Sequence, residues 1–137
     1  SVVSVMYGIN DCQEMSITMA LFAQNLTEII RLVRNQNAIP VIHTPNGIDM
    51  KGMLLMKTAS RSKLPEYVKV MEEIARQQQC ILINHWDYWK NESPERTLSW
   101  LDDPLHPNVE GHVQMARLFF KAIDIFDENS FTCSGRK

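Results

Sequence analysis

The stretch AIPVIHTPNG, residues 38–47, decides the fold because it joins a short apolar, β-branched run to a proline stop and an Asn-Gly turn. This pattern indicates a buried strand that ends in a loop. Apolar periodicity on either side of it predicts one helix over about residues 18–36 and another over residues 65–78. The apolar positions of the first helix step by 4, 3 and 4 residues: Phe22, Leu26, Ile29 and Val33.

The same alternation continues toward both ends of the chain. Residues 2–7 form a β-branched run that predicts a buried strand, and CILIN, residues 80–84, predicts a third strand. A last helix is expected over residues 109–123, after an aromatic-rich segment, residues 86–101, that holds a short helix near Ser93. Strands that alternate with helices predict an α/β fold with a parallel sheet flanked by helices. Ligands of such sheets bind at the carboxyl ends of the strands.

The composition is that of one globular domain, with 137 residues of which 45% are hydrophobic and 22% charged. We expect the domain to cover residues 1–126 and a polar tail to cover residues 127–137. The net charge of −2 and the scattered Lys and Arg residues exclude a nucleic-acid partner. No apolar run approaches the roughly 18 residues of a membrane span. Three distant cysteines without a CxxC pair signal neither a disulfide framework nor a zinc site.

Asp103 and His106 are the first candidates for catalysis. They lie three residues apart in DDPLHPN, residues 102–108, directly before the last predicted helix. A carboxylate bonded to one ring nitrogen of a histidine fixes its tautomer, so the other nitrogen is able to take a proton from a nucleophile. The alternative is a surface loop in which the aspartate caps the helix and the histidine has no role.

The second candidate element is GIND, residues 8–11, at the end of the first strand. Gly8 ends the strand and shapes the loop, and the side chain of Asn10 offers N–H donors to an oxyanion. Asp11 is expected to hold the loop through backbone amides. The alternative for this element is an ordinary turn at a strand end.

Together the two elements resemble the SGNH (GDSL-type) esterase and acylhydrolase family. Two blocks match the family residue by residue: Gly8-Ile9-Asn10-Asp11 and Asp103-Pro104-Leu105-His106-Pro107. The resemblance implies an SGNH-hydrolase, flavodoxin-like α/β fold and an ester hydrolase that needs no cofactor. It also implies an oxyanion-hole role for Asn10 and triad roles for Asp103 and His106. The implied substrate is a small-molecule or glycan ester, with an O-acetyl or short acyl group on a carbohydrate or lipid.

The family's Gly-Asp-Ser nucleophile block does not occur in this sequence. The chain starts where the family's third strand starts, so we expect about 60 to 80 residues to precede it in a longer polypeptide, given ~30 per βαβ unit. The nucleophilic serine is then outside this sequence. A complementary N-terminal segment or a partner chain is expected at the free edge of the first strand. The compartment stays open, and secretion or a periplasmic location is compatible with the sequence.

Two alternatives to a serine esterase remain. The first is a non-catalytic binding module on a degenerate SGNH-like fold, and the second is a hydrolase that uses Cys12, directly after GIND, as its nucleophile. A metal site is not expected, because His106 and His112 are six residues apart and do not share a helix face.

Overall fold

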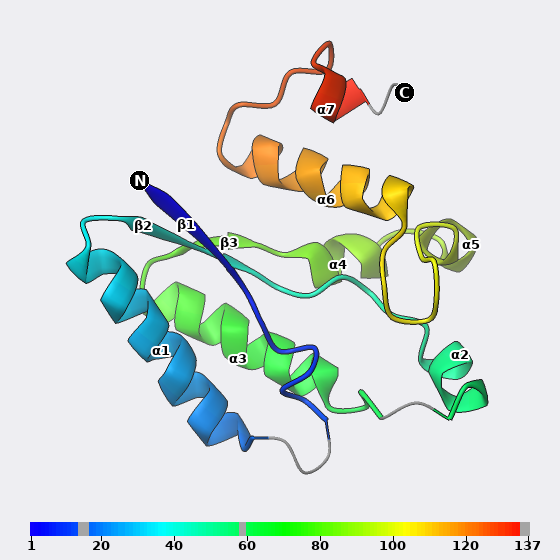
Figure 1. The fold of residues 1–137 in the computed structure, drawn as a ribbon, viewed down its shortest axis with the longest axis horizontal. Coiled ribbons are helices and arrows are strands. Elements are labelled where there is room, and N and C mark those ends of the chain that lie inside the picture. The colour runs from blue at the N-terminus through cyan, green and yellow to red at the C-terminus, as the bar shows by residue number, and fades with distance from the viewer. Residues whose placement is uncertain (14–16, 58–59, 135–137) are drawn as a thin grey trace. The chain divides into compact units, whose positions relative to one another are not determined.

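The computed structural model describes residues 1–13, 17–57 and 60–134. These residues divide into two compact units, which we call the sheet unit (Ser1–Pro45 with Lys57–Asn84) and the helical unit (Asn46–Met56 with His85–Lys137). The elements of each unit follow the chain in the order that Figure 1 colours from blue to red.

The described residues of the sheet unit form three parallel strands. They are β1 (Val2–Met6), β2 (Ile39–His43) and β3 (Ile81–Ile83), in the order β1-β2-β3. Val2 pairs with Ile39, and Val41 pairs with Ile81, so β2 is the central strand. The parallel sheet predicted from the alternating pattern is thereby confirmed.

Two long helices cover this sheet. Helix α1 (Met19–Asn35) and helix α3 (Leu64–Gln77) lie side by side on one face of the sheet (Figure 1). The side chain of Thr18 caps α1 by accepting from the Leu21 N–H, and Pro65 stands in the first turn of α3. Both helices agree with their predicted ranges, because their buried side chains recur at helical spacing: Phe22, Leu26 and Ile30 in α1, and Leu64, Tyr67, Val68, Met71, Ile74 and Ala75 in α3.

Strand β1 is an edge of the sheet, and its burial differs from the prediction. Val5 is buried at 4% exposure, whereas Val2 and Met6 are exposed at 57% and 43%. The sequence predicted a buried strand because its residues, apart from Ser4, are apolar. An edge strand is covered only where a helix packs on it, so its apolar composition did not translate into burial.

The helical unit contains five helices among its described residues. They are α2 (Met50–Leu55), α4 (His85–Lys90), α5 (Pro94–Leu98), α6 (Val109–Ala122) and α7 (Phe131–Ser134). The sequence predicted α5 and α6 but not α4. Helix α4 is short, and its buried residues, His85 and Trp89, are four positions apart on one face. None of the described helices is both long and apolar enough to cross a bilayer.

Helix α6 lies where it was expected, but its buried face is different. The buried residues are Gly111 and Gln114, while Val109 is 73% exposed and the predicted apolar stripe is partly exposed: Val113, Ala116, Phe120 and Ile123. Periodicity identified the helix correctly because it depends on spacing. It did not identify the buried face, because Gly111 and Gln114 are buried by specific contacts with the segments before α6.

The predicted polar tail, residues 127–137, contains helix α7. Cys133 is buried at 3% exposure, and α7 contacts α6. The guanidinium of Arg117 on α6 donates to the carbonyls of Cys133 and Ser134, at 2.6 and 3.0 Å. These bonds satisfy carbonyls at the end of a helix, which otherwise lack partners.

Candidate active site

Asp103 and His106 form a hydrogen-bonded pair in the helical unit. His106 Nδ1 lies 2.7 Å from Asp103 Oδ2, and Asp103 Oδ1 accepts from the backbone N–H groups of Leu105 and His106 at 2.7 and 2.8 Å. The His106 side chain is 69% exposed. The carboxylate thus holds the Nδ1 side of the ring, and Nε2 has no hydrogen-bond partner among the described residues. This is the arrangement that a general base requires.

The electrostatics of Asp103 follow from this geometry. The bond from the His106 ring, with the backbone donors of Leu105 and His106, lowers the pKa of the Asp103 carboxyl from 3.8 to about 2. The carboxylate therefore stays charged at neutral pH. Because the pKa is lowered in the fold, its stabilising contribution is present above the ordinary pKa and is lost as the pH falls through about 2.

We expect carboxyl-detected NMR to show Asp103 titrating near pH 2. The largest cause of the shift is the bond from His106, so in His106→Ala the midpoint is expected to rise toward 3.8. A midpoint that is ordinary in the wild type, or that is unchanged in the variant, would contradict the pairing.

The loop that carries the pair is closed at its base. The Asp102 N–H donates to the carbonyl of His106 at 2.9 Å, and Leu101 and Pro107 form an antiparallel bridge. Asn108 then caps α6 by accepting from the Gly111 N–H at 3.1 Å. The sequence had offered a helix cap as the alternative to catalysis, with the aspartate as the capping residue. In the structure Asn108 caps the helix, so the Asp103 carboxylate is available to His106.

A second segment supports this loop from its other side. The side chain of Asn46 donates to the carbonyl of Leu105 at 3.3 Å, and the Asp49 N–H donates to the carbonyl of Pro104 at 2.8 Å. The sequence predicted the turn at Asn46 but not its contact with the loop that carries Asp103 and His106. No local pattern signals this contact, because the two segments are 59 residues apart.

An aromatic cluster anchors the start of the loop. Trp100 is buried and stacks on Tyr88 at an interplanar angle of 6°. It also packs edge to face against Trp89, with the ring centroids 4.9 Å apart. The guanidinium of Arg96 lies 5.3 Å from the Trp100 ring. Trp89 and Trp100 are therefore core residues, each 2% exposed.

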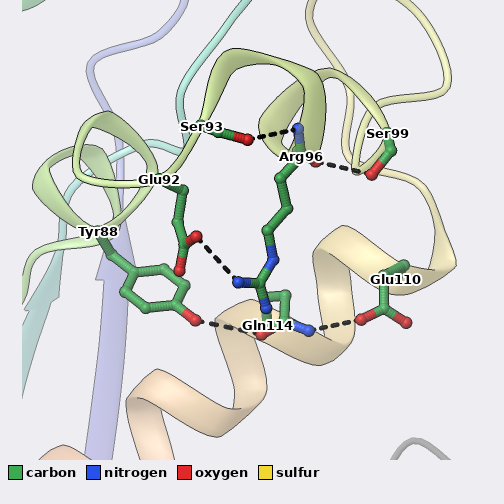
Figure 2. Close-up of polar contacts among 7 residues, drawn as sticks. All are labelled: Tyr88, Glu92, Ser93, Arg96, Ser99, Glu110 and Gln114. Atoms are coloured by element: carbon green, nitrogen blue, oxygen red, sulfur yellow. Dashed lines mark hydrogen bonds and ion pairs between the residues drawn. The ribbon is translucent and has the colours of Figure 1, made fainter.

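Hydrogen bonds connect the same cluster to α6. Figure 2 shows the Tyr88 hydroxyl donating to Gln114 Oε1 at 3.2 Å and Arg96 Nη1 donating to Glu92 at 3.0 Å. The amide nitrogen of Gln114 donates in turn to Glu110. Gln114 is buried, and these bonds satisfy both ends of its amide, as a buried polar group requires. The Tyr88–Gln114 bond thereby joins α4 to α6, and the Arg96–Glu92 bond joins α5 to the turn that follows α4.

Gly111 is the point where α6 packs most closely on the loop. A Cβ added there would meet the carbonyl oxygen of Trp100 and would lie 3.0 Å from Pro107 Cβ. We expect Gly111→Ala to lower the free energy of unfolding by about 1–3 kcal/mol, measured by urea denaturation. At a helix position without this contact, the same change would raise stability by up to about 1 kcal/mol.

The control for Gly111→Ala is Val109→Ala, in the same helical turn, at a side chain that is 73% exposed. Its effect on the free energy of unfolding is expected to stay within about 0.5 kcal/mol. A stabilised Gly111→Ala variant would show that the loop does not pack against this turn.

The predicted oxyanion element, Gly8 to Asp11, lies in the sheet unit at the carboxyl end of β1. Gly8 has a backbone φ of +105°, which residues with a side chain rarely adopt. Its N–H donates to Asp11 Oδ2 at 2.9 Å. The Cys12 N–H donates to the carbonyl of Gly8 at 3.0 Å. The turn is therefore closed on itself, and Asn10 projects from it as an exposed residue.

The carboxamide of Asn10 has two donors on its oxygen. Gln13 Nε2 lies 3.3 Å and Arg61 Nη2 3.0 Å from Asn10 Oδ1. Arg61 is a residue that sequence reasoning missed, because it is 51 residues from Asn10 and its segment has no clear pattern.

Cys12 is poorly suited to act as a nucleophile. It is 2% exposed, and its thiol donates to the carbonyl of Ile9 at 3.3 Å. Burial raises the pKa of the Cys12 thiol, and the nearby charge of Arg61 opposes this only in part. A buried thiol with a raised pKa supplies little thiolate at neutral pH.

A pocket of about 200 Å³ lies in the helical unit, beside the segments that contact the Asp103–His106 loop. Gly47 and Ile48, between the two loop contacts of Asn46 and Asp49, contribute to its wall, and so does Leu101, directly before the loop. Trp86, Trp89 and Leu98 make the remaining wall largely apolar. In residues 1–13, 17–57 and 60–134, no group of three or more His, Cys, Asp or Glu side chains is placed to hold a metal ion.

The chain matches a known protein family. The model of the GDSL-like Lipase/Acylhydrolase family matches residues 1–114. No curated protein matches the chain.

Several solved structures share the fold. A catalytic mutant of Axe2, an acetylxylan esterase from Geobacillus stearothermophilus, is 22% identical with a TM-score of 0.69, over 91% of this chain and 60% of its own. The lipase/acylhydrolase from Enterococcus faecalis is 23% identical with a TM-score of 0.73, over 88% and 59%. A peptidoglycan O-acetylesterase is 20% identical with a TM-score of 0.72, over 90% and 37%. The chain thus spans about 60% of the length of the first two structures.

Proposed function

Because the chain belongs to the GDSL-like lipase/acylhydrolase family, we propose that it supplies two triad members and an oxyanion donor to a serine esterase. The observation that carries this proposal is the Asp103–His106 bond of 2.7 Å, on an exposed loop that leaves Nε2 of the ring open. The nucleophilic serine is outside residues 1–137, since the sequence has no Gly-Asp-Ser block.

In the proposed mechanism the serine hydroxyl attacks the ester carbonyl while His106 Nε2 takes its proton. Asp103 stabilises the imidazolium that forms, and the side-chain N–H of Asn10 donates to the oxyanion of the tetrahedral intermediate. When that intermediate collapses, the C–O bond breaks and the leaving alkoxide takes the proton from His106. Water then attacks the acyl-serine by the same route, which releases the acid and restores the enzyme.

The proposed substrate carries an acetyl or other short acyl group on a carbohydrate or lipid. The pocket beside the catalytic loop, at about 200 Å³, is smaller than the roughly 300–1,000 Å³ of sites for drug-sized ligands. Its largely apolar wall of tryptophan and leucine suits a short acyl chain. The acetylxylan esterase and the peptidoglycan O-acetylesterase of similar fold act on acetyl esters, which supports this choice.

We further propose that a segment or chain bearing the serine pairs with β1. Val2 and Met6 are exposed on this edge strand, whose backbone offers donors and acceptors to a neighbour. Pairing there would extend the parallel sheet at the edge next to the Gly8 turn.

The test is ester hydrolysis by the natural full-length polypeptide. It is expected to hydrolyse p-nitrophenyl acetate faster than the octanoate and to react with a fluorophosphonate probe at one serine outside residues 1–137. Mass spectrometry of the labelled peptides identifies that serine. A label on a serine within residues 1–137 would contradict the proposal, and no label with no turnover would favour a binding module on the same fold.

A further inference from the structure

The orientation of the Asn10 carboxamide is determined by its neighbour. A guanidinium has only donors, so the Asn10 atom that lies 3.0 Å from Arg61 Nη2 has to be the oxygen. An amide oxygen has two acceptor sites, and Gln13 Nε2 occupies the second at 3.3 Å. The N–H₂ end, which has no acceptor among the described residues, is therefore the end presented outward.

The burial of Arg61 gives this contact a fixed geometry. Arg61 is 7% exposed, although arginine is among the residues that are rarely buried. Its carbonyl accepts from the Leu64 N–H at 2.9 Å, which joins its backbone to the first turn of α3. Gln13, by contrast, makes its bond to Asn10 at an exposed position. Of the two donors on Asn10, Arg61 is the one that the fold holds in place.

We propose that Arg61 is the positioning residue of the oxyanion hole, which locks the Asn10 amide with its N–H donors toward the substrate. The inference rests on the proposed function, because it requires Asn10 to be the oxyanion donor. A cation bonded to an amide oxygen also draws electron density from the amide, which makes its N–H a stronger donor. Both effects stabilise charge that develops in the transition state, so they act on kcat more than on KM.

The test compares Arg61→Met with Lys63→Met. Lys63 lies two residues away at the start of α3, is exposed and makes no side-chain capping bond, so both variants remove one positive charge from the same segment. The first readout is NMR of this chain, which follows the side-chain amide ¹H and ¹⁵N resonances of Asn10. We expect them to move in Arg61→Met and to stay in place in Lys63→Met.

The second readout is kinetic and uses the natural full-length polypeptide. Arg61→Met is expected to lower kcat up to about 100-fold with KM unchanged, as for a misplaced catalytic group, and Lys63→Met to change kcat less than about twofold. Arg61→Lys keeps the charge and a donor, and is expected to recover most of the loss. If Arg61→Met does not fold, Arg61→Lys is the test in its place. The Asn10 resonances of Arg61→Lys are then expected to lie near those of the wild type.

The outcomes separate this inference from the proposed function. If the Asn10 resonances stay in place when Arg61 is replaced, the positioning role is wrong, whatever the activity. If they move but Asn10→Ala retains full activity, Asn10 is not the oxyanion donor, and both the assignment and this inference are overturned. If kcat and KM change together and Arg61→Lys recovers nothing, Arg61 has only a structural role.

Discussion

Replacing His106 with alanine is expected to lower kcat for p-nitrophenyl acetate by ~100- to 10,000-fold in the natural full-length polypeptide, the range that a general base contributes. The reason is the geometry of its ring, with Nδ1 held by Asp103 at 2.7 Å and Nε2 open. Without the imidazole, the serine proton has no acceptor and the leaving alcohol has no donor. KM is expected to change little, because the ring acts on the reacting protons.

The matched control for this variant is His112→Ala. His112 is also an exposed histidine of the helical unit, on α6, only six residues along the chain. Its replacement is expected to leave kcat within about twofold of the wild type, as for a surface substitution away from the reacting groups. An equal loss of kcat in the two variants, or full activity in His106→Ala, would contradict the catalytic assignment of His106.

Replacing Asn10 with alanine is expected to lower kcat by ~100- to 1,000-fold, the effect of removing one oxyanion donor. In the proposed mechanism the side chain donates only to charge that appears in the tetrahedral intermediate, so KM is expected to stay close to that of the wild type. The Gly8 turn is closed by the bonds of Gly8 and Cys12, which do not involve the Asn10 side chain. Asn10→Ala also removes an acceptor of the buried Arg61 guanidinium, so the melting temperature is expected to fall while the turn itself stays closed.

Asn25→Ala is the control for the asparagine variant. Asn25 is exposed on α1 in the same unit, and its replacement is expected to leave kcat unchanged. If Asn10→Ala is largely unfolded at the assay temperature, its loss of kcat would instead indicate damage to the turn. Undiminished kcat would show that the oxyanion is stabilised by other donors.

Local patterns in the sequence were sufficient for the elements of the sheet unit. The helices α1 and α3 and the parallel strands β2 and β3 follow from apolar spacing, because burial of one helix face or of a central strand leaves a regular trace. The same patterns located β1 and α6, but they did not predict the exposure of β1 or the buried face of α6. Apolar composition shows that a segment is able to be buried, and its neighbours decide whether it is.

The sequence by itself determined the family and the Asp103–His106 pair. The two residues are three positions apart, so a single turn with Pro104 brings the carboxylate to the ring without help from distant segments. Only the tertiary structure decided what holds the site: Asn46 and Leu105 are 59 residues apart, and Arg61 and Asn10 are 51 apart. Such contacts depend on the packing of segments whose local patterns are independent of one another, so no spacing rule within either segment encodes them.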